Sequence, residues 1–272
     1  MSQRRYLVFG AHPDDCDLLF GGTAVKLARA GHLVKFVSVC NGDCGHYAMD
    51  RGALAARRYA ETQASAEIAG LAEYQVLDLH DCGIENTLEN RGRIVRIIRQ
   101  FRPDVVLSHR DCDYHADHRA TARLVMDAAY LIKVPLYCRD TPIPAKNPVF
   151  AYCYDRFRDP RPIRADAAVE IDSVLETKLR MADCHASQFY EWLPWDKGFK
   201  DFDATSMTWE EKRQWLYTQW GCRFEAAAEL GRETLCKIYE EAGKQIRCAE
   251  IFEFSEYGEP ISEEGFRDLF PR

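Results

Sequence analysis

A short loop near the N-terminus constrains this chain more than any other stretch. Residues 6–9 read Tyr-Leu-Val-Phe, which predicts a short buried strand. Residues 11–15 follow as Ala-His-Pro-Asp-Asp, and a helical pattern is expected over about 21–30, opening with Gly-Gly-Thr. In an open α/β sheet, ligands bind beyond the carboxyl ends of the strands, so this loop lies where a functional site is expected.

The neighbouring carboxylates of Asp14 and Asp15 need a reason to share so short a loop. Adjacent carboxylates repel, so one of them stays protonated unless a cation is near. A divalent metal supplies that cation if His12 and one aspartate bind it, and the other aspartate is then free for proton transfer. The alternative is a polar turn with a surface histidine, and this loop alone does not separate the two interpretations.

A second polar cluster follows another buried-strand pattern, at residues 103–108. Residues 113–118 read Asp-Tyr-His-Ala-Asp-His, and a helical pattern follows over about 120–132. Two histidines flanking an aspartate offer a further metal ligand and a His–Asp pair. Strands and helices alternate along the chain, which predicts a parallel sheet covered by helices, so the two clusters can face each other across its edge.

Several stretches together resemble the PIG-L/LmbE-like zinc-dependent N-deacetylase family. The main ones are residues 11–15, 21–23, 41–43 and 115–118, with weaker likenesses at 58–61, 77–83, 185–188 and 249–252. The resemblance covers about residues 5–190 and the strand near 250, and it departs at Asp17, where the family usually has Glu. It implies an α/β, Rossmann-like three-layer fold with a mostly parallel sheet.

The resemblance also implies roles for individual residues. Zinc is implied at His12, Asp15 and His118, an open set of three ligands that leaves one position for water. Asp14 matches the general base of the family. His115 matches the residue that stabilises the developing charge and protonates the leaving amine, with Asp117 holding its ring.

Four further positions are expected around the substrate. Arg58 matches a substrate-binding arginine on the second helix, and Tyr114 lies where relatives place a polar group near the carbonyl. Asp81 is expected to support the site or to touch the substrate, and His185 to line the substrate site. The other histidines are interpreted as surface or core residues: His32, His46, His80 and His109.

These roles imply a zinc-dependent hydrolase that removes the N-acetyl group from an amino sugar such as N-acetylglucosamine, or from a glycoside of one. Two alternatives stay open: a zinc amidase acting on another acyl amide, and a non-catalytic metal- or sugar-binding module. Asp14 weighs against the module, because binding alone needs no spare base beside the ligands.

Overall charge and hydropathy limit the partners. The 272-residue chain carries a net charge of −7, whereas nucleic-acid binding needs concentrated positive charge. No stretch reaches the roughly 18 apolar residues of a membrane span, and residues 1–5 run into a strand too short and too quickly polar for a signal peptide. We therefore expect a cytoplasmic enzyme with a small-molecule substrate and no membrane partner, and leave a homo-oligomer open. Arginines over 91–99 are interpreted as a solvated helix face.

We expect one domain over 1–272, with a core at about 5–188. An aromatic-rich helical insertion is expected at about 189–220, and a C-terminal helix and strand at about 221–256. The insertion holds all five tryptophans and is interpreted as packed core, with a lid or an oligomer contact as the alternatives. The tail after 258 is expected to be peripheral. The 11 cysteines are interpreted as reduced and mostly buried, and neither Cys16 nor Cys112 is expected to bind the metal.

Overall fold

The computed structural model describes residues 2–272, and its centre is one sheet of seven strands. The strands are β1 (Arg5–Gly10), β2 (Leu33–Cys40), β3 (Glu73–Leu79), β4 (Val105–Ser108), β5 (Val149–Cys153), β6 (Ala167–Glu170) and β7 (Ala249–Gly258). Their spatial order is β3-β2-β1-β4-β5-β7-β6, with β1 to β5 parallel and β7 antiparallel to both its neighbours. The expected mostly parallel sheet is confirmed.

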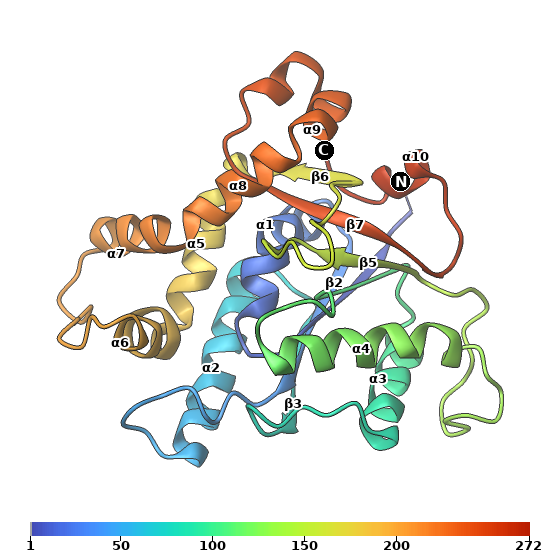
Figure 1. Ribbon diagram of the computed structural model, residues 1–272, viewed down its shortest axis with the longest axis horizontal. Helices are drawn as coiled ribbons and strands as arrows, with labels where there is room; N and C mark the ends of the chain where they lie inside the picture. Colours follow the sequence, from blue (N-terminus) through green and yellow to red (C-terminus); the bar gives the residue numbers. More distant parts are fainter. Residues whose placement is uncertain (1) are drawn as a thin grey trace.

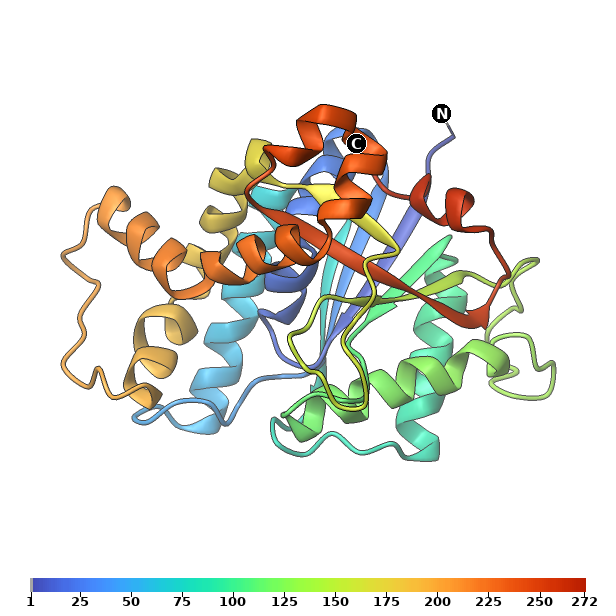
Figure 2. The ribbon, with the colours of Figure 1, turned by 45° about the horizontal axis from the view of Figure 1, so that its top comes forward.

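Helices cover both faces of this sheet (Figures 1 and 2). One face packs against α1 (Asp15–Arg29), α2 (Arg51–Ala69) and α5 (Leu175–Cys184), and the other against α3 (Leu88–Phe101) and α4 (Ala116–Leu131). The remaining helices are α6 (Leu193–Asp196), α7 (Trp209–Leu216), α8 (Cys222–Leu230), α9 (Arg232–Tyr239) and α10 (Glu263–Arg267). The α/β three-layer architecture is thus the one expected from the sequence. No helix within residues 2–272 is long and apolar enough to cross a membrane.

The two central strands set the position of the site. The chain moves outward from β1 through β2 to β3, and then returns to place β4 on the other side of β1. Loops that leave β1 and β4 therefore diverge to opposite sides and open a crevice between them. This reversal of strand order is where α/β sheets bind ligands, and both polar clusters of the sequence lie there.

Two helices begin earlier than the sequence indicates. α1 starts at Asp15 and not near 21, so Gly21 and Gly22 lie inside the helix. A Cβ atom at Gly22 would lie 2.6 Å from Ile171 Cγ2, so the glycine permits close packing and does not start the helix. α4 likewise starts at Ala116, four residues before the expected start. The candidate metal ligands of both clusters therefore lie at or near helix N-termini.

The aromatic segment forms its own cluster against α5. Phe189, Tyr190, Leu216 and Trp220 are buried together with Leu179 of α5. This packing agrees with the packed-core interpretation for these residues, whereas residues 196–201 of the same segment are exposed.

The C-terminal part differs from the expected single helix and peripheral tail. The helix is divided at Gly231 into α8 and α9. Glycine fits this point because a Cβ atom there would lie 2.7 Å from Ile251 Cγ2. The tail is not peripheral. Phe270 stacks on Phe252 with ring centroids 4.6 Å apart, and Phe266 is buried beside them, so apolar burial holds the tail to the sheet.

Arg99 corrects the interpretation of 91–99 as a solvated face. Its side chain is 1% exposed, and its guanidinium donates to carbonyl oxygens at 2.8–3.2 Å and to no carboxylate of the described chain. The acceptors are the carbonyls of Leu131, Ile132, Val134, Tyr137, Cys138 and Thr141. One buried arginine thereby joins α3 to the end of α4 and to the loop that follows it.

Candidate active site

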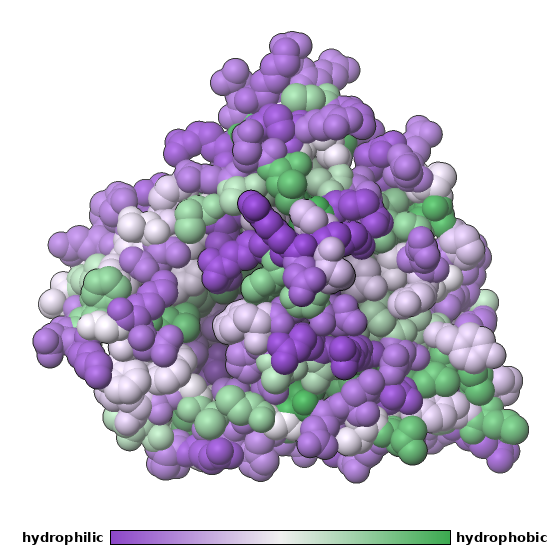
Figure 3. Space-filling view, viewed as in Figure 1, coloured by the Kyte–Doolittle hydropathy of each residue, from purple (hydrophilic) through white to green (hydrophobic). Residues whose placement is uncertain are grey.

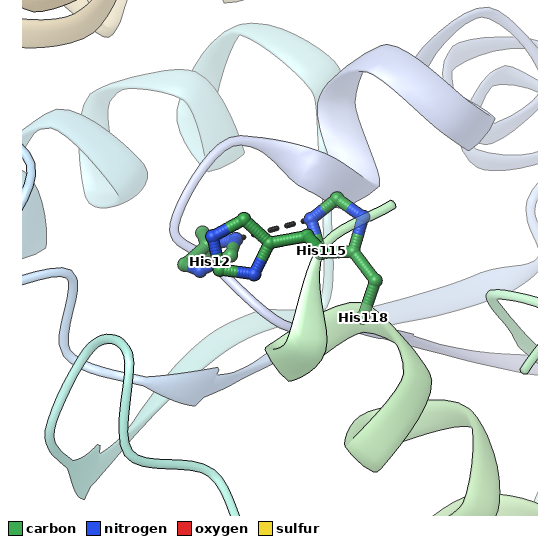
Figure 4. A group of neighbouring side chains, drawn as sticks. All are labelled: His12, His115 and His118. Carbon is green, nitrogen blue, oxygen red and sulfur yellow. Dashed lines mark hydrogen bonds between the residues drawn. The ribbon is translucent and has the colours of Figure 1, made fainter. Parts of the chain in front are cut away.

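Three side chains point their ligand atoms toward a common centre at the ends of β1 and β4. Figure 4 draws the contact between His12 and His118 as a dashed line. His12 Nδ1 lies 3.2 Å from His118 Nε2 and 3.3 Å from Asp15 Oδ2. Asp15 Oδ1 lies 3.4 Å from His118 Nε2. Ligands held about 2.0–2.1 Å from a tetrahedral zinc ion are roughly 3.3–3.4 Å apart. The three residues expected to bind zinc therefore form a triangle whose sides are near this spacing, with Asp15 facing His12 through Oδ2 and His118 through Oδ1. They belong to two overlapping metal-sized groups, His12–His115–His118 and Asp15–His109–His118.

The first loop is shaped locally to make this triangle. Asp14 is the N-cap of α1, Asp15 is its first residue, and the His12 N–H donates to Asp15 Oδ2 at 2.8 Å. A Cβ atom at Gly10 would lie 2.7 Å from the Cβ of Asp15. Glycine is needed at the end of β1 because the chain turns back on itself before the helix begins.

Carboxylates lie behind both histidine ligands. His12 Nε2 is 3.3 Å from Asp81 Oδ1 and 3.4 Å from Asp117 Oδ2, at ion-pair distance but out of line for a hydrogen bond. Burial opposes a charge on His12, but these carboxylates and that of Asp15 hold the pKa of His12 well above its ordinary range. Outer carboxylates of this kind orient a metal-binding imidazole and raise its basicity.

His118 has an outer carboxylate of its own. Its Nδ1 lies 3.1 Å from Asp113 Oδ2, so its Nε2 is left facing the centre. Burial lowers the pKa of His118, but Asp15 and Asp113 outweigh burial and raise it. Asp113 was not singled out from the sequence, although it opens the second cluster.

The neighbouring carboxylates of Asp14 and Asp15 have opposite properties. Burial raises the pKa of Asp14, with the charge of Asp15 adding to the rise and Arg58 opposing it. For Asp15, burial is outweighed by His118 and His109, which hold its pKa well below its ordinary range. Environments that separate two carboxylates in this way are typical of an anionic ligand beside a proton acceptor.

Arg58 lies on α2, and a hydrogen bond holds its guanidinium against the carboxylate of Asp14. Its side chain is 2% exposed, with Nη2 donating to Asp14 Oδ1 at 3.1 Å and Nη1 donating to the carbonyl of Gly42 at 3.3 Å. Gly42 has a positive φ of 68°, and a Cβ atom there would lie 2.4 Å from Arg58 Nη1. The loop after β2 needs glycine there because it wraps the guanidinium closely. Arg58 thus contacts the candidate base directly.

His115 and Asp117 are not paired as expected. The His115 Nδ1 accepts the backbone N–H of Asp117 at 3.1 Å. The Asp117 carboxylate instead accepts the N–H groups of Cys82 at 2.7 Å and Ile84 at 3.2 Å, and it faces His12. The loop after β3 supplies these donors and draws the carboxylate away from the His115 ring.

His115 keeps a neutral ring at the edge of the triangle. Burial and the charges of His12 and His118 lower its pKa. Because its Nδ1 accepts a hydrogen bond, the neutral ring carries its proton on Nε2. One of its ring nitrogens lies within 4.8 Å of the nitrogens of His12 and His118. The ring of Tyr114 lies 5.7 Å from that of His115, and Tyr114 is 71% exposed, so it stands at the mouth.

His185 does not line the site as the sequence-based hypothesis expects. Its side chain is 0% exposed, and its Nε2 lies 3.3 Å from Asp17 Oδ2. Asp17 also accepts hydrogen bonds from Tyr74 at 2.9 Å and from Ser65. His185 and Asp17 therefore belong to a buried polar network, and His185 has no surface with which to contact a substrate.

His109 is the main site residue that the sequence did not reveal. Its ring stacks on His118 with centroids 4.2 Å apart, and its Nε2 lies 3.4 Å from Asp15 Oδ2. That nitrogen accepts the backbone N–H of Ala11 at 3.2 Å, which occupies the lone pair a metal would use. With Nε2 accepting this N–H, the neutral ring cannot donate to Asp15 from that nitrogen, and we interpret His109 as a packing support for the ring of His118. Its position directly after β4 was the available signal.

Cysteine ligands are disfavoured at this centre. Cys40 lies beside His12, Asp81 and Asp117 at metal-binding spacing, but burial raises the pKa of its thiol to about 12. A protonated thiol is a poor ligand. No metal-sized group in residues 2–272 includes Cys16 or Cys112.

Several known proteins are similar to this chain in sequence. A family model described as PIG-L: GlcNAc-PI de-N-acetylase matches residues 7–129. Diacetylchitobiose deacetylase of Thermococcus kodakarensis is 32% identical over 200 residues, covering 71% of this chain and 74% of that protein. A 1D-myo-inositol 2-acetamido-2-deoxy-alpha-D-glucopyranoside deacetylase of Streptomyces griseus is 29% identical over 168 residues, about half of each chain (51% and 52%).

Solved structures show the same fold at lower identity. N,N'-diacetylchitobiose deacetylase from Pyrococcus horikoshii superposes with a TM-score of 0.71 at 22% identity, over 93% of this chain and 84% of that one. GalB, the 4-carboxy-2-hydroxymuconate hydratase from Pseudomonas putida, gives a TM-score of 0.70 at 19% identity, over 96% and 100%. Because these two names describe different reactions, the fold alone does not define the activity. The extent of the match to the Thermococcus kodakarensis protein does define the family, and this chain belongs to the PIG-L family of de-N-acetylases.

Proposed function

We propose that this protein is a zinc-dependent N-deacetylase acting on an N-acetylated amino sugar or a glycoside of one. The observation that carries the proposal is the triangle of His12, Asp15 and His118 with Asp14 beside it. The ligand atoms are spaced for a tetrahedral ion, and the adjacent carboxylate has a raised pKa and is not part of the triangle. The deacetylase names of the relatives support the reaction class.

The ligand set fits zinc in its chemistry as well as its size. Two imidazoles and one carboxylate leave a tetrahedral ion one open position, as in catalytic zinc sites. Zinc bound there would polarise the amide carbonyl and make a water molecule more acidic. The outer carboxylates of Asp81, Asp117 and Asp113 would keep both imidazoles oriented toward the ion.

Asp14 acts as the general base in this proposal. Its raised pKa makes it a stronger proton acceptor than an exposed carboxylate, while Arg58 at 3.1 Å keeps it oriented and ionised. Asp14 takes a proton from the attacking water and can return it to the departing nitrogen. Its neighbour Asp15 stays anionic throughout, because its pKa is held low.

His115 stabilises the charge that develops on the carbonyl oxygen. Its lowered pKa keeps the ring neutral, and its Nε2–H is free to donate because Nδ1 is already bonded to the N–H of Asp117. A donor aimed at developing charge is worth about 10²–10³ in kcat in comparable sites. Since a neutral imidazole is a weak acid, we assign the proton of the leaving amine to Asp14 and the hydrogen bond to His115.

A substrate panel tests this function. The zinc-loaded protein is incubated with N-acetylglucosamine, N,N'-diacetylchitobiose, an N-acetylglucosaminide and simple N-acyl amino acids, and both acetate and free amine are measured. We expect equal amounts of the two from sugars and none after chelation. Release from the amino acids alone would favour the amidase alternative. Zinc binding without release from any compound would favour the binding module.

A further inference from the structure

The loop between β2 and α2, residues 41–50, supports two parts of the candidate site. Asp43 is 3% exposed, and its Oδ1 accepts the backbone N–H of Asp81 at 3.0 Å. The Asp81 carboxylate lies 3.3 Å from His12 Nε2. The carbonyl of Gly42 accepts a hydrogen bond from the arginine that contacts the candidate base. A displacement of this β2–α2 loop would therefore change the surroundings of a metal ligand and of the base.

A histidine–glutamate contact holds the second half of the β2–α2 loop. His46 Nε2 lies 2.8 Å from Glu191 Oε2, at the start of the aromatic segment (189–220). His46 Nδ1 accepts the backbone N–H groups of Ala48 at 3.0 Å and Met49 at 3.2 Å. The neutral ring therefore carries its proton on Nε2 and donates it to the glutamate. One imidazole thus folds the loop on itself and binds it to a distant segment.

The glutamate of this contact is fixed from α2. Glu191 lies in a π-helical stretch, Ser187–Trp192, a rare conformation that is frequent at functional sites. Arg57 of α2 donates to Glu191 Oε2 at 2.8 Å, and its Nε lies 3.2 Å from Glu61 Oε1. Glu61 accepts the Ser187 N–H at 2.9 Å and the Ser187 Oγ–H at 2.6 Å. The loop is thus attached to a glutamate whose own position is well defined.

Stacked aromatic rings join the same two segments. Tyr47 stacks on His46 with ring centroids 4.8 Å apart, and on Trp195 with centroids 5.2 Å apart. The angles between these ring planes are 17° and 15°. Trp195 stacks in turn on Trp192 at 5.6 Å. The loop therefore has an apolar attachment to the aromatic segment in addition to the polar one.

The attachment lies beside a hollow in the surface. In Figures 1 and 2 the β2–α2 loop passes beside α6. Figure 3 shows the surface hollowed between this side of the molecule and the start of α4, the helix that carries His118. The start of the aromatic segment and the start of α4 therefore lie on opposite sides of the hollow.

We propose that His46 and Glu191 are positioning residues, which hold the β2–α2 loop against the site by fixing it to the start of the aromatic segment. The two residues act through Gly42 and Asp43 and do not touch the substrate. Because a misplacement of about 1 Å far from the chemistry can cost about 10² in rate, a loosened loop should slow the reaction. The expected effect on turnover rests on the proposed function, whereas the hold on the loop does not.

Glu191→Ala tests the contact through kinetics. It should lower kcat for the sugar substrates by about tenfold or more and leave KM nearly unchanged, because the contact orients catalytic groups and binds no substrate. The matched control is Glu176→Ala. Glu176 accepts hydrogen bonds from Trp209 at 2.8 Å and from Arg213 at 2.9 Å, so it holds α7 of the same segment. The control should leave kcat unchanged, whereas a general loosening of the segment would affect both variants.

A double-variant cycle assigns the effect to the pair. His46→Ala and Glu191→Ala should each lower kcat, and the double variant should lower it no further than His46→Ala alone. Losses that multiply in the double variant would mean that the two residues act independently, and this result would overturn the pairing.

Two measurements need no turnover. In Glu191→Ala, hydrogen exchange at the amides of Ala48 and Met49 should be faster than in the unmodified protein or in Glu176→Ala, because the His46 ring loses the partner that orients it. Zinc affinity, measured by competition with a chelator, should fall by about three- to tenfold. Removing an outer partner of a ligand directly typically costs about 10–100-fold, and here the effect passes through Asp43 and Asp81.

The outcomes separate this inference from the proposed function. Unchanged kcat and unchanged zinc affinity in Glu191→Ala would overturn the positioning role and leave the deacetylase function standing. If no sugar of the panel is deacetylated, the proposed function fails, and zinc affinity then decides the positioning role. A loss of affinity in Glu191→Ala but not in Glu176→Ala supports it, and equal affinities overturn it.

Discussion

Arg58 donates a hydrogen bond to Asp14 across 3.1 Å, between two side chains that are both buried. This contact links the middle of α2 to the N-cap of α1. It balances a carboxylate that burial would otherwise tend to protonate. The pairing means that the candidate base can be perturbed without touching any of the three residues of the triangle.

Replacing Arg58 should therefore change the pH dependence of the reaction. Arg58→Met removes the charge that lowers the pKa of Asp14, so that pKa should rise. A general base works above its pKa, so the acidic limb of the kcat/KM profile should move to higher pH. Arg57→Met is the matched control on the same helix, because Arg57 pairs with Glu191 and Glu61. An unshifted limb in Arg58→Met would contradict the assigned contact.

Substitutions at the two neighbouring aspartates should have different effects. Asp14→Asn keeps the shape of the side chain but cannot take a proton, so zinc should stay bound while kcat falls by about 10²–10⁴. Asp15→Asn replaces a charged ligand by a weak neutral one, so zinc should be lost on dialysis and activity should partly return with excess zinc. Zinc content and kcat are measured for both. Loss of metal from Asp14→Asn alone would reverse the assigned roles.

His109 should tune the metal affinity without being a ligand. Its removal in His109→Ala takes away the ring that stacks on His118 with centroids 4.2 Å apart, and changes behind a ligand typically cost about 10–100-fold in metal affinity. His118→Ala removes a ligand and should abolish tight binding. Competition with a zinc chelator measures both. Equal losses in the two variants would mean that His109 also binds the metal.

Arg99→Lys should destabilise the fold and leave the chemistry intact. An ammonium has three donors and cannot serve six carbonyl oxygens, so the loss should be about 2–4 kcal/mol of unfolding free energy. Arg91→Lys, on the same helix, changes surface contacts with Asp127 and Asn86 and should cost less than about 1 kcal/mol. Urea denaturation measures both, and similar losses would contradict the role of Arg99.

The sequence allowed the fold and the centre of the site to be predicted because both are encoded locally. Apolar runs mark the strands, and His12, Asp14 and Asp15 follow one of them within a few residues. The ends of β1 and β4 meet because adjacent parallel strands place their carboxyl ends together.

Other features of the site depend on contacts between distant segments. The Asp117 carboxylate turns toward His12 because Cys82 and Ile84 offer N–H groups from the loop after β3, and no local pattern shows this. His185 likewise lies away from the substrate site because it pairs with the buried Asp17. The start of α1 was misplaced because Gly21 and Gly22, which pack closely against other elements from inside the helix, look in the sequence like the point where a helix begins.

The hydrogen bonds that Arg99 makes to main-chain carbonyls bear on which side chains of residues 131–141 can be substituted. All the acceptors of Arg99 are main-chain oxygens, so these hydrogen bonds fix the backbone of residues 131–141 and do not themselves depend on the side chains there. Leu136 lies within this stretch and is largely exposed. The segment can therefore change at exposed positions such as Leu136, provided that the core residue Ile132, Cys138 with its positive φ and the arginine on the neighbouring helix are kept. It is a natural place to graft a foreign epitope or a label far from the chemistry.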